Sequence, residues 1–178
     1  MSMIDKSAPD FETDAYVNGE LKKVKLGDYK GRWVILFFYP ADYTFVCPTE
    51  IAGFADEYEK FKSKKCDVLS VSSDSAYVHM AWAKSDPRIK KVGYPMLADR
   101  TGAIAKSYAV YNDATGNAFR GLFIINPEGV VKYEVITADS VGRSTEETLR
   151  VLCALQNGSL CPVNWHAGEP TINAAKKS

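Results

Sequence analysis

Two short segments rich in apolar residues stand out along the chain, and a helix-like pattern follows each of them. The apolar segments are residues 33–39 and 67–72. Strands that are covered on both faces show such nearly continuous apolar runs. Apolar residues then recur at helical spacing over 48–63, and a second helix is expected from 75 to about 84. This alternation predicts two parallel central strands joined by a right-handed crossover.

Turn signals predict two hairpins, one before and one after this central part. Asn18-Gly19 lies within the mixed polar and apolar segment 11–26, and this dipeptide is typical of two-residue hairpin loops. The tetrapeptide 126–129, Asn-Pro-Glu-Gly, carries residues favoured in a type I turn. It joins the apolar segments 119–125 and 130–136, which we expect to pair as antiparallel strands.

The last helix has both of its ends marked in the sequence. Ser144 and Glu147 form a capping box, and the helical pattern stops at Gly158. The segment between the central part and the second hairpin is less regular. There we expect a loop over 86–95, followed by a short strand and a short helical segment.

Taken in order, these elements predict an α/β protein with a thioredoxin-like fold and an N-terminal hairpin extension. The periodicity stops after Gly158. We therefore expect a single domain over residues 1–158 and a C-terminal tail over 159–178 that carries Cys161.

Composition argues against several classes of partner. The 178 residues include 22 basic and 22 acidic side chains, so no excess of charge favours binding to nucleic acid or to an anionic membrane. The chain has no apolar segment typical of a secretory signal or a membrane span. The expected localisation is therefore cytoplasmic.

The four cysteines do not form the pattern of a small secreted disulfide framework. The chain has no C-x-x-C motif, and the spacing of Cys153, Cys161 and His166 fits no common zinc site, so no metal is expected. Cys66 and Cys153 occupy apolar positions and are interpreted as structural.

Cys47 is the candidate nucleophile. Pro48 follows it as the first residue of the predicted helix, a position where proline is favourable. At a helix N-terminus the free backbone N–H groups favour a thiolate over a thiol. The alternative from this location alone is a buried, inert cysteine that caps a core helix.

The spacing Pro40-x-x-x-Thr44-x-x-Cys47 resembles the active-site signature of the peroxiredoxins. The longer match through Glu50 resembles the typical two-cysteine subgroup, which includes the bacterial alkyl hydroperoxide reductase small subunit and thioredoxin peroxidases. The resemblance implies a thioredoxin-like fold of the peroxiredoxin type. It also implies a thiol peroxidase for hydrogen peroxide and organic hydroperoxides, active in antioxidant defence, with no metal, haem or flavin cofactor of its own.

The resemblance also implies roles for Thr44 and Pro40, which both precede Cys47. The hydroxyl of Thr44 would contact both the sulfur and the peroxide, whereas a loop hydroxyl is the simpler interpretation. Pro40 would shield the sulfur and shape the pocket, although a proline that ends a strand needs no catalytic reason.

Three charged residues are similarly implied. Arg120 would hold the thiolate and the peroxide oxygens, because a guanidinium stays charged and offers several donors in one plane. The alternative is a solvated charge at the rim of a strand, the usual role of a lone arginine there. Glu50 would orient an active-site arginine, or else only complement the helix dipole. Arg143 is a second candidate for the same site, and a plain surface arginine is the alternative.

The resemblance also implies how the cycle closes. A sulfenic acid on Cys47 condenses with a second thiol, and Cys161 looks like the resolving cysteine, which such proteins supply from the partner subunit. This implies a homodimer, assembled into a ring of five dimers. Electrons would come from thioredoxin or from a flavoprotein disulfide reductase.

The alternative functions are a dithiol oxidoreductase and a holdase chaperone. A dithiol oxidoreductase needs a second cysteine near Cys47, and the sequence has none three residues further on. A holdase chaperone would keep its activity in Cys47→Ser. His79 and His166 are expected to be packing or surface residues, and Val163 and Trp165 to be tail anchors or ordinary core residues.

Overall fold

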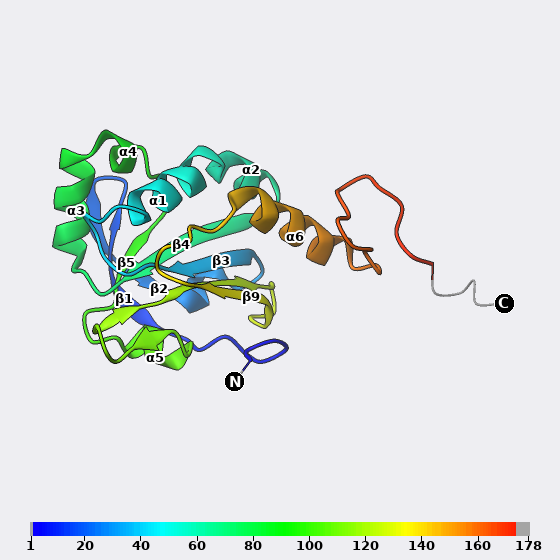
Figure 1. Ribbon diagram of the computed structural model, residues 1–178, viewed down its shortest axis with the longest axis horizontal. Helices are drawn as coiled ribbons and strands as arrows, with labels where there is room; N and C mark the ends of the chain where they lie inside the picture. Colours follow the sequence, from blue (N-terminus) through cyan, green and yellow to red (C-terminus); the bar gives the residue numbers. More distant parts are fainter. Residues whose placement is uncertain (1, 174–178) are drawn as a thin grey trace. The chain divides into compact units, whose positions relative to one another are not determined.

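A seven-stranded sheet organises the first of the two units into which the chain divides, residues 1–143 and 144–178. The structure is a computed structural model that describes residues 2–173 (Figure 1). The strand order in the sheet is β2-β1-β5-β4-β3-β8-β9. The strands are β1 (Glu12–Val17), β2 (Glu20–Lys25), β3 (Trp33–Phe38), β4 (Cys66–Ser72), β5 (Met96–Ala98), β8 (Arg120–Ile125) and β9 (Val131–Thr137).

The two central strands are parallel, as the sequence predicts. In β3 and β4 the apolar side chains are buried almost throughout, because helices cover both faces of the sheet. Helices α1 to α4 lie over one face and α5 lies on the other (Figure 1). Their bounds are α1 (Cys47–Asp56), α2 (Tyr58–Ser63), α3 (Ala76–Ser85), α4 (Pro87–Lys90) and α5 (Ala103–Ser107), and a 3-10 turn, η1, covers Leu26–Tyr29.

Both predicted hairpins are present. β1 and β2 pair antiparallel around Asn18 and Gly19, whose φ angles of 48° and 93° are those that a tight hairpin turn requires. β8 and β9 pair antiparallel across the turn at 126–129, in which the N–H of Gly129 donates to the carbonyl of Asn126. β1 also pairs with β5, so the N-terminal hairpin extends the central sheet.

Three local features differ from the sequence prediction. The helix expected over 48–63 is divided at Glu57, whose ψ of 0° is not helical. The loop expected over 86–95 contains α4, because Asp86 accepts a hydrogen bond from the N–H of Arg88 and Pro87 provides the first helical residue. A small hairpin of β6 (Tyr111–Asn112) and β7 (Asn117–Ala118) was not expected.

The second unit contains α6 (Thr145–Asn157) followed by the tail. Ser144 caps the helix by accepting from the N–H of Glu147, and Gly158 ends it with a φ of 72°. The carboxylate of Glu147 pairs with Arg150 rather than completing the capping box. The division at residue 158 stays a prediction.

The tail is ordered by contacts of its own. Leu160 and Ile172 form a β-bridge, and the indole N–H of Trp165 donates to the carbonyl of Glu169. Trp165 is buried, so it is a packed residue, whereas Val163 is 88% exposed and anchors nothing within the described chain. Residues 174–178 of the expected tail lie outside the described residues.

Candidate active site

Cys47 is the first residue of α1 and is completely buried. The preceding residue, Val46, makes no side-chain capping hydrogen bond, and Pro48 stands in the first turn, as expected. The partial positive charge of the helix N-terminus therefore acts on the sulfur without a competing polar cap. This is the electropositive kind of setting in which reactive cysteines are found.

Arg120 lies beside the sulfur. Its Nη1 is 3.4 Å from the Cys47 Sγ and 2.7 Å from Oε2 of Glu50, and its Nε donates to the carbonyl of Asp139. Arg120 is only 3% exposed. Burial alone would lower the pKa of the guanidinium, but the Cys47 sulfur and Glu50 together raise it. A fixed positive charge therefore faces the sulfur at Cys47.

Glu50 joins this arginine to a second one. Its Oε1 accepts from both the backbone N–H and Nε of Arg143, and its Oε2 accepts from Nη2 of Arg143 and Nη1 of Arg120. Burial would raise the pKa of Glu50, but Arg143 and then Arg120 outweigh it, so the pKa lies below the ordinary value. The site thus contains two guanidinium groups and one carboxylate, and a thiolate would balance the remaining charge.

Arg143 belongs to this cluster and is no surface residue, because its side chain is 2% exposed. Its Nη1 donates to the carbonyl of Gly121 at 2.6 Å, and its guanidinium carbon lies 5.3 Å from the centre of the Phe37 ring. Such a cation–π contact stabilises a buried guanidinium. No sequence pattern predicts this aromatic support under Arg143.

The sheet explains why these groups meet. β8 runs antiparallel to β3, with Phe37 opposite Leu122, so the start of β8 lies at the edge where β3 ends. Arg120 therefore reaches the loop that follows β3. Gly121 is required here because a Cβ would lie 2.7 Å from a Val110 methyl group, and the same residue offers its carbonyl to Arg143.

Thr44 and Pro40 lie in the loop between β3 and α1. The Thr44 hydroxyl donates to the carbonyl of Ala41 at 2.9 Å, which is the simple loop role, and the side chain is exposed. Its oxygen can still accept a hydrogen bond. Pro40 is half-buried directly after the end of the strand. Contacts of Thr44 and Pro40 with a peroxide stay predictions.

A buried polar network that no sequence pattern predicts supports this loop. Asp42 accepts a hydrogen bond from the Tyr39 hydroxyl, and its other oxygen lies 2.7 Å from Nδ1 of His79. The His79 Nε2 lies 3.2 Å from the carbonyl of Leu97. Burial raises the pKa of Asp42 even though His79 and Tyr39 act against it. His79 is therefore a packing residue that holds the loop.

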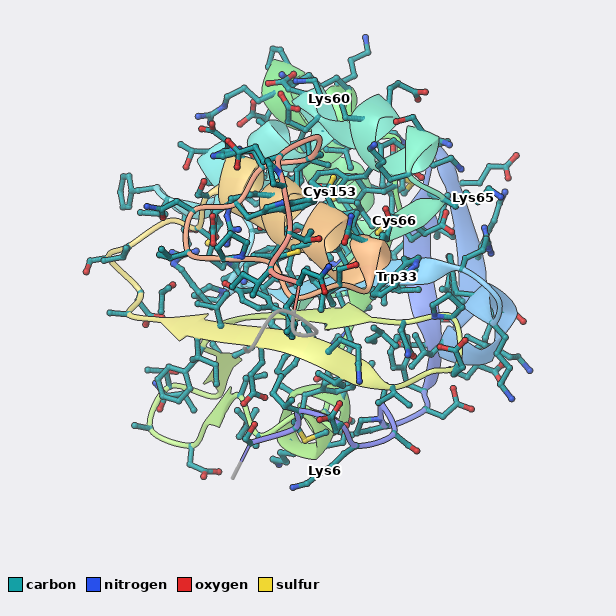
Figure 2. All side chains as sticks on the ribbon, turned by 90° about the vertical axis from the view of Figure 1, so that its right-hand side faces the viewer. Lys6, Trp33, Lys60, Lys65, Cys66 and Cys153 are labelled. Atoms are coloured by element: carbon teal, nitrogen blue, oxygen red, sulfur yellow. The ribbon has the colours of Figure 1, made fainter. Side chains whose placement is uncertain are left out.

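All four thiols are free. Cys66, at the start of β4, is buried, and burial raises the pKa of its thiol, which confirms its structural interpretation (Figure 2). Cys153, on α6, is half-buried (Figure 2). Cys161 is half-buried in the tail of the second unit, with its Sγ 3.9 Å from the carbonyl of Ala154.

Metal-binding clusters and membrane-spanning helices are both absent from the part of the chain that the structure describes. Residues 2–173 contain no group of three or more histidine, cysteine or carboxylate side chains placed to hold a metal ion. None of the helices in this range is long and apolar enough to cross a bilayer.

The chain is similar to a group of known proteins. The sequence profile of the AhpC/TSA family matches residues 4–134. A putative peroxiredoxin in the rubredoxin operon of Clostridium pasteurianum is 45% identical over 176 residues, which cover 96% of this chain and 98% of that protein. Peroxiredoxin-2 of Mus musculus is 44% identical over 178 residues, which cover 96% of this chain and 90% of the mouse protein.

Solved structures give the same result. The crystal structure of Enterococcus faecalis AhpC superposes with a TM-score of 0.88 at 44% identity and covers 91% of this chain and 100% of that one. The reduced 2-Cys peroxiredoxin of Plasmodium vivax superposes with a TM-score of 0.91 at 32% identity and covers 96% of this chain and 92% of that one. The thioredoxin-like fold of the peroxiredoxin type is thereby confirmed.

Proposed function

The chain belongs to the AhpC/TSA family of peroxiredoxins, thiol-dependent enzymes that reduce peroxides, and we propose that Cys47 is the thiol that peroxide oxidises. The single observation that carries this assignment is the 3.4 Å contact between the Arg120 Nη1 and the Cys47 Sγ. It joins a cysteine at a helix N-terminus to a buried cation, the electropositive surroundings that mark a reactive cysteine.

In the first step the Cys47 thiolate attacks one oxygen of the peroxide. A sulfur–oxygen bond forms, the oxygen–oxygen bond breaks, and the other oxygen takes up a proton and leaves as water or an alcohol. Arg120 stabilises the thiolate and the charge that develops on the leaving oxygen. Glu50 and Arg143 hold Arg120 in place, while Thr44 and Pro40 shape the entrance.

In the second step the Cys161 thiol of a second copy attacks the sulfenic acid on Cys47. A disulfide forms and water leaves. Because Cys47 is completely buried, its turn of α1 has to open before this step. The two-cysteine pattern supports a homodimer, which we propose assembles into a ring of five dimers.

An external dithiol protein returns the disulfide to two thiols. Either thioredoxin or a flavoprotein disulfide reductase fits this requirement chemically. One relative, 42% identical over 172 residues, is named thioredoxin peroxidase in Fasciola hepatica. This name supports thioredoxin as the first reductant to test.

The test is one equivalent of hydrogen peroxide added to the fully reduced protein, followed by non-reducing gels. Wild type is expected to form a covalent dimer, and Cys47→Ser and Cys161→Ser are expected to form none. Cys66→Ser is the matched control and should behave as wild type. Loss of thiols without a covalent dimer would withdraw the intersubunit step, and unchanged oxidation of Cys47→Ser would overturn the assignment of Cys47.

A further inference from the structure

Phe45 is an aromatic side chain that the described residues 2–173 leave almost entirely uncovered. It lies two residues before Cys47 and is 95% exposed, the highest value among the large apolar side chains of residues 2–173. Exposure of a whole aromatic ring to water is unfavourable. A ring held in this position beside the reacting cysteine therefore suggests a contact with a second copy of the chain.

An apolar groove lies beside the other reacting cysteine. It is formed within the second unit, between α6 and the tail, and has a volume of about 400 Å³. Val151, Ala154 and Leu155 contribute from α6, and Cys161 and Val163 contribute from the tail. The Cys161 sulfur and Val163 thus share one opening, and Val163 is largely exposed.

We propose that this groove receives the Phe45 ring of a second copy of the chain when Cys47 of that copy forms its disulfide with Cys161. The inference rests on the proposed two-cysteine cycle and adds to it a docking surface with a defined occupant. In the chemical step, the Cys161 thiolate attacks the sulfenic sulfur of Cys47. The sulfur–sulfur bond forms, the sulfur–oxygen bond breaks, and the oxygen leaves as water after taking up a proton.

Covalent geometry brings the ring to the groove. The two Cα atoms of a disulfide lie within about 7 Å of each other. Two residues of extended chain add at most about 7 Å, so the Phe45 backbone stays within about 14 Å of Cys161. The groove begins at Cys161 itself, so a ring that must lie near this cysteine finds an apolar surface there.

The charges around the groove are compatible with an aromatic guest. Among the described residues that line it, Arg150 is the only charged one, and its guanidinium is paired with Glu147. A guanidinium at the rim of an apolar pocket also favours an aromatic face. Docking of Phe45 would hold the opened loop against the tail, and it would thereby accelerate disulfide formation but not the reaction with peroxide.

The test separates the two steps in a single turnover. Reduced wild type, Phe45→Ala and the matched control Phe45→Leu are mixed with one equivalent of hydrogen peroxide and quenched at intervals. Loss of the Cys47 thiol reports the first step, and the covalent dimer on non-reducing gels reports the second. We expect the first rate to stay within about twofold, and the second to fall about tenfold in Phe45→Ala and much less in Phe45→Leu.

A second variant tests the groove itself. Val163→Ser alters a largely exposed side chain, so the fold is retained, and it should also slow the second step. The rate of disulfide formation in the double variant Phe45→Ala/Val163→Ser should lie within about twofold of the rate in the slower single variant, because both substitutions remove the same contact.

Equal rates of disulfide formation in wild type and Phe45→Ala would overturn the docking proposal, as would additive effects in the double variant. A slower first step with a normal second step would also overturn it, because Phe45 would then act on the peroxide. Failure of wild type to form any covalent dimer would overturn the two-cysteine cycle together with the docking proposal. The wild-type lane of the gel shows that outcome, which is therefore distinguishable from a failure of the docking proposal alone.

Discussion

Replacing Glu50 by glutamine tests whether the buried charge cluster is organised as described. Glu50 is 4% exposed, and its two oxygens accept four hydrogen bonds from Arg120 and Arg143. An amide keeps one acceptor oxygen but directs an NH₂ group at donors on its other side. About two of the four bonds are therefore lost, and the two buried guanidinium groups lose the carboxylate that they share as a counter-charge.

The magnitude follows from these contacts. A hydrogen bond to a charged group contributes about 1.5–3 kcal/mol, so the loss of two gives about 3–6 kcal/mol. Removing one partner of a buried ion pair costs about 3–5 kcal/mol, which agrees. We therefore expect Glu50→Gln to lower the free energy of unfolding by about 3–5 kcal/mol. Glu59→Gln, which changes an exposed glutamate, should lower it by less than about 0.5 kcal/mol.

The same substitution should change the pH dependence of stability. The folded pKa of Glu50 lies below its ordinary value of 4.5, so the folded state favours the ionised carboxylate. The stability that this provides is present above pH 4.5 and is lost as the pH falls through the lower, folded pKa. Wild type should therefore lose stability in this acidic window more steeply than Glu50→Gln.

The assay is urea unfolding of the reduced protein, followed by far-UV circular dichroism, at pH 7 and at intervals below pH 5. The slope against urea must stay unchanged for the midpoints to be compared as free energies. If Glu50→Gln lost less than about 1 kcal/mol at pH 7 and kept the same acid dependence as wild type, the cluster would not carry the charge balance inferred here.

Three further predictions concern the neighbouring residues. Arg120→Lys should reduce the second-order rate constant of Cys47 oxidation by hydrogen peroxide about 10²-fold in stopped-flow measurements, because an ammonium group cannot bind the sulfur and the carboxylate in one plane. The exposed control Arg88→Lys should leave the rate constant unchanged, and an unchanged rate constant in Arg120→Lys would refute the prediction. Gly121→Ala should lower the free energy of unfolding, measured by urea unfolding, by about 1–3 kcal/mol, since its Cβ would lie 2.7 Å from a Val110 methyl group, and a neutral effect would show that Val110 moves freely. The resemblance to the peroxiredoxins implies that members with a Gly-Gly-Leu-Gly loop overoxidise readily, and residues 90–95 read Lys-Lys-Val-Gly-Tyr-Pro in the corresponding region. Peroxide titration with a recycling reductant should therefore show relative resistance to inactivation, and inactivation at low peroxide would contradict this.

Local signals in the sequence account for most of the fold. Asn18-Gly19 needs positive φ at both residues, and the structure has them, so the first hairpin could be predicted from two residues. The apolar runs of residues 33–39 and 67–72 predicted the strands β3 and β4 equally well. Asp86-Pro87 was misleading, because a proline that ends one helix can also be the first residue of the next. The hydrogen bond from the Arg88 N–H to Asp86 shows that a new helix begins here.

The candidate site was predictable only in part. The position of Cys47 followed from Pro48 and the helical pattern after it, which are local features. Arg143 meets Glu50 across 93 positions of sequence, and His79 meets Asp42 across 37, so no periodicity could pair them. Contacts of this kind depend on strand order, which the sequence pattern left open.

The most direct test of the central assignment is peptide mass spectrometry of the reduced protein after one equivalent of hydrogen peroxide, with dimedone present to trap sulfenic acid. In Cys161→Ser, the account predicts that the dimedone adduct lies on Cys47 and on none of the other cysteines. In wild type without dimedone, it predicts a linked pair of peptides that contain Cys47 and Cys161. A dimedone adduct on Cys66 or Cys153, with Cys47 still reduced, would contradict the assignment of Cys47 as the residue that peroxide oxidises.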